Sequence, residues 1–188
     1  MRLTNVLFVA ALGGFALFAS CKKVDDLKNA YTGSGDLAAG QATISFNTDK
    51  DFNGTTSINI KPGSTTSAVK SSSNSVNDNI VLTATSVDIS TGKISTAQLA
   101  MYVPKNSTTT SGNITVPFKG SSTNFAVLTI SNTNTGQSTP AYGMETGNVV
   151  ITKLTATEIE GTFSGHATND TENTSINLSN GHFAGKFN

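Results

Sequence analysis

Cys21 is the residue whose surroundings predict a chemical reaction most clearly. It is the only cysteine of the 188-residue chain, so its thiol has no disulfide partner within the chain. It directly follows Phe18-Ala19-Ser20 at the end of an apolar run that starts at Val6. This arrangement is typical of the lipobox, the tetrapeptide that ends a bacterial lipoprotein signal peptide. We therefore predict that residues 1–20 are a signal peptide and that the thiol of Cys21 carries lipid, with palmitate among its acyl chains.

The alternative for this segment is a short membrane anchor that is not cleaved. A membrane-spanning helix needs about 20 apolar residues, and the run from Val6 to Phe18 is shorter and is interrupted by Gly13-Gly14. The small residue before Cys21 is also what a cleavage site requires. The sequence therefore favours lipidation of Cys21, with the acylated residue holding the chain to a lipid bilayer.

Residues 49–54 resemble the first half of a calcium-binding loop, in which alternating oxygen ligands precede a glycine turn. The twelfth position of such a loop carries a bidentate Glu, but here it is Ile60, which alternates with Ile58 as in a strand. The pattern therefore favours a β-hairpin with Asn53-Gly54 as its tight turn. We predict no metal or cofactor. The alternative that stays open is calcium bound by Asp49, Asp51 and Asn53.

The histidines and paired carboxylates of the last third are weaker candidates. His166 and His182 could share the wet face of a hairpin, but two ligands without a nearby Cys or carboxylate fall short of a zinc site. Glu158 and Glu160 share one face of a predicted strand, and a glycosidase needs such a pair, yet a solvent-facing strand explains them more simply. The sequence has no G-x-S-x-G motif. We predict no catalytic residues and no enzyme activity.

Composition limits the fold class and the partners. Only 13% of the residues are charged, and 12 basic residues balance 12 acidic ones. No basic stripe is present to attract nucleic acid, so no nucleic-acid partner is expected. Polar uncharged residues, many of them Thr, suit strands with one wet face rather than amphipathic helices.

Alternation with a period of two begins at Ala42 and predicts one all-β domain over residues 41–188. It predicts nine or ten short strands separated by polar loops such as 71–75, 107–112 and 132–140, with no convincing helix. We expect an antiparallel β-sandwich, and the alternative is a closed, calycin-like β-barrel. Residues 21–40 precede this domain and are Gly- and Ser-rich at their end, so they are expected to form a flexible tether.

The last third also carries a resemblance to a known group. Residues 147–152, 159–164 and 180–183 are similar to the closing strands of small Bacteroidota lipoproteins that carry an all-β domain of unknown function, and Ala42–Phe46 is compatible with the same group. The resemblance implies an outer-membrane location and no particular activity. The charged residues that follow Cys21 resemble the signal that exports such lipoproteins to the cell surface. They are Lys22, Lys23, Asp25 and Asp26.

The function expected from the sequence is a lipid-anchored binding or structural module without catalytic activity. It would lie at the outer membrane, on the cell surface or facing the periplasm, and bind an envelope protein or a glycan. The alternative is a small-molecule carrier with a cavity inside a β-barrel. A hydrolase is the third possibility. Tyr31, Tyr102 and Tyr142 are scattered along the sequence, so no aromatic platform for sugar stacking is expected.

The lipidation site gives a direct prediction. Cys21→Ala removes the thiol but lies before the predicted tether, so we expect the β-domain to stay folded while the chain leaves the membrane. Membrane fractionation measures the release, and circular dichroism measures the fold. A chain that stays in the membrane fraction after the substitution would show that the lipobox interpretation is wrong.

Overall fold

The computed structural model describes residues 33–51, 55–60, 66–88, 93–120, 123–134 and 141–188, and these form strands joined by turns. Cys21 lies outside them. A short 3-10 helix, η1 (Ser34–Asp36), precedes the strands. The strands are β1 (Ala42–Thr48), β2 (Ser57–Ile60), β3 (Ser67–Ser72), β4 (Asn77–Asp88), β5 (Lys93–Pro104), β6 (Ile114–Pro117), β7 (Ala126–Asn134), β8 (Tyr142–Leu154), β9 (Glu158–Asn169) and β10 (Thr174–Lys186).

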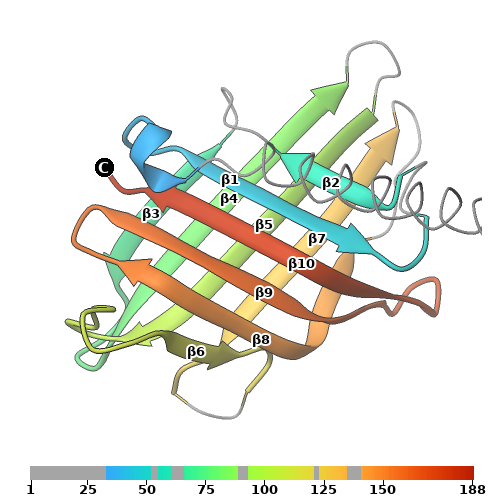
Figure 1. Ribbon diagram of the computed structural model, residues 1–188. Coiled ribbons are helices and arrows are strands. Elements are labelled where there is room, and N and C mark those ends of the chain that lie inside the picture. Colours follow the sequence, from blue (N-terminus) through green and yellow to red (C-terminus); the bar gives the residue numbers. More distant parts are fainter. Residues whose placement is uncertain (1–32, 52–54, 61–65, 89–92, 121–122, 135–140) are drawn as a thin grey trace, which may run out of the picture. The chain divides into compact units, whose positions relative to one another are not determined.

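All ten strands belong to one antiparallel sheet in the order β2-β1-β10-β9-β8-β7-β5-β4-β3, with β6 paired to β8. The sheet curls so that β1 and β2 contact β4 across the core. In Figure 1, β4, β5 and β7 cross behind β1, β10 and β9. The predicted all-β antiparallel class is therefore confirmed, as a half-barrel in which one sheet supplies both walls.

The inner face of this sheet forms the core. Alternate residues of β4 and β5 point inward, and Ile80, Leu82 and Leu99 are fully buried. On the other wall, the rings of Phe46 and Phe163 lie 5.9 Å apart in a tilted arrangement. Burial of these alternate apolar residues is the main stabilising term, at roughly 1.5–3 kcal/mol for each large side chain.

Gly40 links β10 to the edge strand β3 across the curl of the sheet. Its N–H donates to the carbonyl of Lys186 on β10 (2.7 Å), and its carbonyl accepts the N–H of Ala68 on the edge strand β3 (2.9 Å). Gly40 has a φ of 79°, a conformation that residues with side chains rarely adopt. The chain that enters β1 therefore supplies the polar groups that close one end of the half-barrel.

The strand pattern of the sequence agrees with the structure at several specific points. Pro104 ends β5, and the ladder between β9 and β10 shifts register between Leu178 and Gly181, with Asn180 at a φ of 50°. Strand β3 was not predicted, and its Ser71 and Ser72 fall in an expected loop. This edge strand pairs only with β4 and buries only Ala68 among its residues, so it shows no apolar alternation.

A glycine substitution tests the close packing of β9. A Cβ at Gly161 would collide with the ring of Phe183 and the carbonyl of Val150, whereas a Cβ at Gly143 of β8 would meet nothing within 4 Å. We expect Gly161→Ala to lower the free energy of unfolding by roughly 1–3 kcal/mol. Gly143→Ala is the matched control and should change it little. Thermal unfolding measures both, and equal melting temperatures would contradict the packing described above.

Candidate functional site

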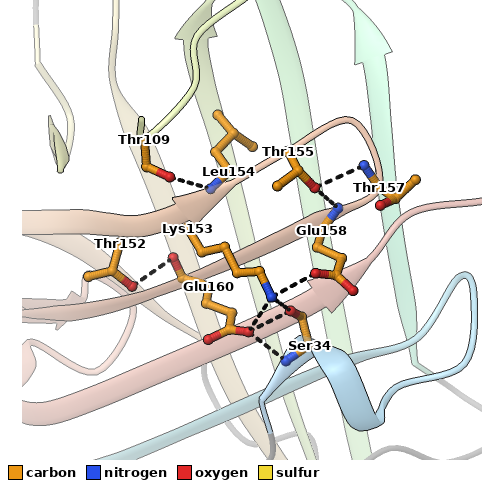
Figure 2. Close-up of polar contacts among 9 residues, drawn as sticks. All are labelled: Ser34, Thr109, Thr152, Lys153, Leu154, Thr155, Thr157, Glu158 and Glu160. Carbon is orange, nitrogen blue, oxygen red and sulfur yellow. Dashed lines mark hydrogen bonds and ion pairs between the residues drawn. The ribbon is translucent and has the colours of Figure 1, made fainter. Parts of the chain in front are cut away.

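Ser34 of η1 is the buried centre of a partly exposed polar cluster on the outer face of β8 and β9. Its N–H and its hydroxyl both donate to Oε1 of Glu160, at 2.9 and 2.5 Å. The side chain of Ser34 is fully buried. Figure 2 shows η1 lying over β9, with Ser34 pointing at Glu160. We call Ser34, Lys153, Glu158 and Glu160 the docking cluster, because it holds the segment before β1 against the sheet.

Lys153 completes the docking cluster from β8. Its Nζ lies 2.7 Å from Oε2 of Glu158, 3.3 Å from Oε1 of Glu160 and 3.1 Å from Oγ of Ser34 (Figure 2). The hydrogen bond from Lys153 lowers the pKa of Glu158, and the one to Glu158 raises the pKa of Lys153. Around neutral pH, the amine is therefore an ammonium and the carboxyl of Glu158 is a carboxylate.

Local features of the β8–β9 hairpin place these side chains. The β8–β9 ladder shifts register between Ile151 and Lys153, and such a bulge turns Lys153 to the outer face opposite Glu160. At the turn, the hydroxyl oxygen of Thr155 accepts the N–H groups of Thr157 and Glu158. This turn fixes the start of β9, so both carboxylates point at Lys153.

The docking cluster is a clamp rather than a nucleophile. Ser34 and Lys153 are close enough to suggest a Ser–Lys pair, but the hydroxyl proton is donated to Glu160 and the amine is already protonated. A serine nucleophile needs a neutral base and access to substrate, and Ser34 has neither. Glu158 also lacks the raised carboxyl pKa that a glycosidase acid requires, since the hydrogen bond from Lys153 lowers the pKa of Glu158.

A second polar group, on the same outer face, joins the residue that follows β1 to β10 and β9. Asp49 accepts the backbone N–H of Asn177 (2.8 Å) and its side-chain NH₂ (2.7 Å), and these bonds lower the pKa of the aspartate. The amide oxygen of Asn177 lies 2.9 Å from Nδ1 of His166. Because that oxygen only accepts, Nδ1 of His166 carries the proton and the lone pair of the neutral ring is on Nε2.

This arrangement bears on the predicted calcium ligands. Both oxygens of Asp49 are engaged by Asn177, and Ile60, at the position of the missing Glu, is buried in β2. Asp51 is exposed, and Asn53 lies outside the described residues. The described residues show β1 and β2 paired as a hairpin, whereas the predicted tight turn at Asn53-Gly54 lies outside them.

The two histidines lie on the outer face as predicted but do not meet. His166 is opposite Asn177, whereas His182 is opposite Thr162, four residues away along β9. Burial lowers the pKa of His182. Within the described part of the chain, no three His, Cys, Asp or Glu side chains are grouped so that they could hold a metal ion.

The helices of the described part are all too short or too polar to cross a membrane.

Sequence reasoning missed Ser34 and the pairing of Tyr102 with Phe125. Ser34 belongs to the segment that the sequence assigns to the flexible tether, yet residues 33–41 lie against β9 and β10. Nothing local marks Ser34, because its partner Glu160 is 126 residues away. The rings of Tyr102 and Phe125 stack with centroids 4.6 Å apart, a pairing that the positions of the aromatic residues in the sequence did not indicate.

Comparisons with protein-family models, with curated proteins and with solved structures find no match for this chain.

The docking cluster predicts how the segment before β1 responds to substitution. Lys153→Met removes the ammonium that faces Glu158 and Glu160, so we expect faster hydrogen exchange at the amide of Ser34. The melting temperature should fall little, because exposed ion pairs contribute little to stability. Lys119→Met removes the exposed Lys119–Glu145 pair and is the matched control. Equal exchange at Ser34 in all three chains would contradict the clamp.

The same cluster predicts a pH dependence. The pKa of Glu158 is lower in the folded chain than its ordinary value of 4.5, so its stabilising contribution is present above pH 4.5 and is lost as the pH falls through the folded pKa. We expect the carboxyl carbon of Glu158 to titrate below 4.5 by NMR and to return toward 4.5 in Lys153→Met. A midpoint at or above 4.5 in the unmodified chain would contradict the ion pair.

Proposed function

We propose that this chain is a lipid-anchored, non-catalytic binding or structural module of the bacterial envelope, related to the small Bacteroidota lipoproteins that its sequence resembles. The acylated residue would be Cys21, and the β-domain would be displayed at the outer membrane, on the cell surface. The observation that carries the proposal is the docking cluster, which fixes to the β-domain the segment that follows the predicted anchor.

The docking cluster matters because of where it lies in the chain. If Cys21 is in the membrane, only residues 22–33 separate the lipid from the clamp at Ser34. Fully extended, they span at most about 40 Å at ~3.3 Å each. An anchored domain therefore stays near the membrane, and the outer face of β9 and β10, to which η1 is docked, carries the link to the lipid.

The state of the ionisable groups supports a non-catalytic role. Lys153, Glu158 and Glu160 are engaged with one another, and Asp49 and His166 are engaged through Asn177. These contacts hold segments of the chain together across strands. A neutral base beside an accessible nucleophile, which covalent catalysis needs, is not formed by the groups of the docking cluster.

The carrier hypothesis has less support. A Cβ at Gly185 would lie 2.6 Å from Cδ2 of Leu82, so β10 and β4 approach closely across the interior. Such contact between opposite walls favours a packed core over a cavity that holds a ligand. Native mass spectrometry of the purified chain would detect a retained small molecule as added mass, and that result would favour the carrier.

Surface display can be tested on intact cells. The charges after Cys21 resemble an export signal, so replacing Lys22, Lys23, Asp25 and Asp26 together by Ala should keep the chain in the membrane fraction but reduce its digestion by an added protease. Replacing Lys119 and Glu145 by Ala is the control, because these charges lie on the folded domain. We expect the unmodified chain and the control to be digested equally.

Two results would contradict the proposal. Protection of the unmodified chain in intact cells, with digestion only after lysis, would place the domain inside the envelope rather than on the surface. A hydrolytic activity that is lost on replacing Ser34 or His166 alone would show that the chain is an enzyme.

A further inference from the structure

The outer face of β3, β4, β5 and β7 carries no charged side chain among the residues that the structure describes. The registers place one set of alternate residues of these strands on this face. Its central rows consist of apolar, hydroxyl and amide side chains. We call it the uncharged face, and its residues are Ser67, Val69, Ser71, Asn77, Asn79, Val81, Thr83, Thr85, Val87, Ile94, Thr96, Gln98, Ala100, Tyr102, Phe125, Val127, Thr129 and Ser131.

The opposite outer face, on β8, β9 and β10, differs sharply in charge. It carries the docking cluster, the Asp49–Asn177–His166 group and the pair of Lys119 with Glu145. The wall made of β3, β4, β5 and β7 does have charged residues, such as Lys70 and Asp78. In the part that the structure describes, they belong to the inward-facing set near the strand ends, where Lys70 and Asp78 pair with each other. Charge is therefore divided between the two outer faces, and η1 is docked on the charged one.

The uncharged face is open and partly apolar. Val69, Val81, Ala100 and Val127 lie opposite one another and form a row across four strands. Val69 is 48% exposed and Val87 is 53% exposed. Beside this row runs a second one of Thr83, Gln98 and Thr129, in which the amide of Gln98 donates to the hydroxyl of Thr83. The face therefore offers adjacent apolar and hydrogen-bonding strips.

An aromatic pair lies beside the apolar row, next to Ala100 and Val127. The rings of Tyr102 and Phe125 are 4.6 Å apart with an interplanar angle of 29°, and the N–H of Tyr102 donates to the carbonyl of Phe125. Asn79 is directly opposite Tyr102 on β4. Both rings are half-buried, so part of their surface remains accessible on this face.

Two buried amide oxygens next to this pair have no hydrogen-bond partner. They are Oδ1 of Asn77, a residue only 4% exposed, and Oδ1 of Asn79. The NH₂ group of Asn77 is already fixed by the carbonyl of Thr123 (2.9 Å). A buried acceptor without a donor costs free energy, so these oxygens mark a place where a hydroxyl donor, brought in by a small shift of the surface side chains, would be stabilising.

From these observations we infer that the uncharged face binds an uncharged glycan. A sugar ring presents apolar C–H groups, which pack on the aromatic pair and the valine row, and hydroxyl groups, which bond to the Thr, Gln and Asn side chains. An acidic ligand would find no cation on this face. The inference deepens the proposed binding role and rests on it, because an anchored domain docked through its charged face leaves the uncharged face available.

Affinity electrophoresis of the full chain tests this inference. The chain is kept in a polyoxyethylene detergent, which contains no sugar, and the gels contain α-glucan, β-glucan, mannan or xylan, with anionic alginate for comparison. We expect at least one uncharged polysaccharide, but not alginate, to retard the chain. Tyr102→Ala should weaken the retarding interaction by about tenfold or more, a change of about 1.4 kcal/mol or more.

A second variant, which introduces a charge, tests the glycan site even if the Tyr102→Ala chain does not fold. Gln98→Glu places a carboxylate on the exposed surface of the uncharged face and should weaken binding. Asn148→Asp makes the same amide-to-carboxylate change on an exposed residue of β8 and should leave binding unchanged. Melting temperatures of both variants should stay close to that of the unmodified chain.

Three results would overturn the inference. They are no retardation by any of the uncharged polysaccharides, equal retardation of the unmodified chain and Gln98→Glu, or a dimer in sedimentation experiments that Gln98→Glu dissociates. The fractionation of Cys21→Ala separates the two proposals. A chain that is membrane-bound through Cys21 but binds no glycan refutes only the glycan site, whereas a glycan-binding chain that needs no Cys21 for membrane attachment refutes only the anchor.

Discussion

The fold depends on one constraint: a single sheet must bury its inner face against itself. Both walls of the core come from the same ladder of strands, so side chains of β10 must reach those of β4 without a separate layer between them. Gly185 lies so close to Leu82 that a side chain there would collide with it. Gly40 then closes one end of the curled sheet by bonding both β10 and β3. Small residues at the contacts therefore allow the sheet to curl tightly enough to exclude water.

Much of this fold could be predicted because a strand that is buried on one face alternates apolar and polar residues in its sequence. Leu99 and Met101 alternate with polar or small residues, and Pro104 ends the strand because it has no N–H to donate. Strand β3 could not be predicted in this way, because an edge strand with a single buried alanine shows no alternation. The curl of the sheet was also beyond sequence reasoning. It depends on contacts between β1 and β4, which are far apart in the chain.

The candidate sites were less predictable than the strands, for a related reason. Glu158 and Glu160 were recognised as sharing a face, but their partner Ser34 comes from a Gly- and Ser-rich segment with no helical or strand pattern. Tyr102 and Phe125 are separated by more than twenty residues and meet only because β5 and β7 are neighbours in the sheet. Such residues are brought together by the register between neighbouring strands, and that register is set by the packing of the whole sheet rather than by the residues themselves. The division of charge between the two outer faces emerges in the same way.

The docking cluster has a mechanical consequence. If the chain is held by lipid at one end and by a bound ligand at the other, tension enters the domain at Ser34. The force first loads the short bonds to Glu160 and Lys153 and then passes along β1, which lies between β2 and β10. Hydrogen bonds on both sides of β1 would then be sheared together rather than opened one at a time. In an anchored chain, the bonds of Ser34 would therefore have to break before a pulling force could separate β1 from the sheet.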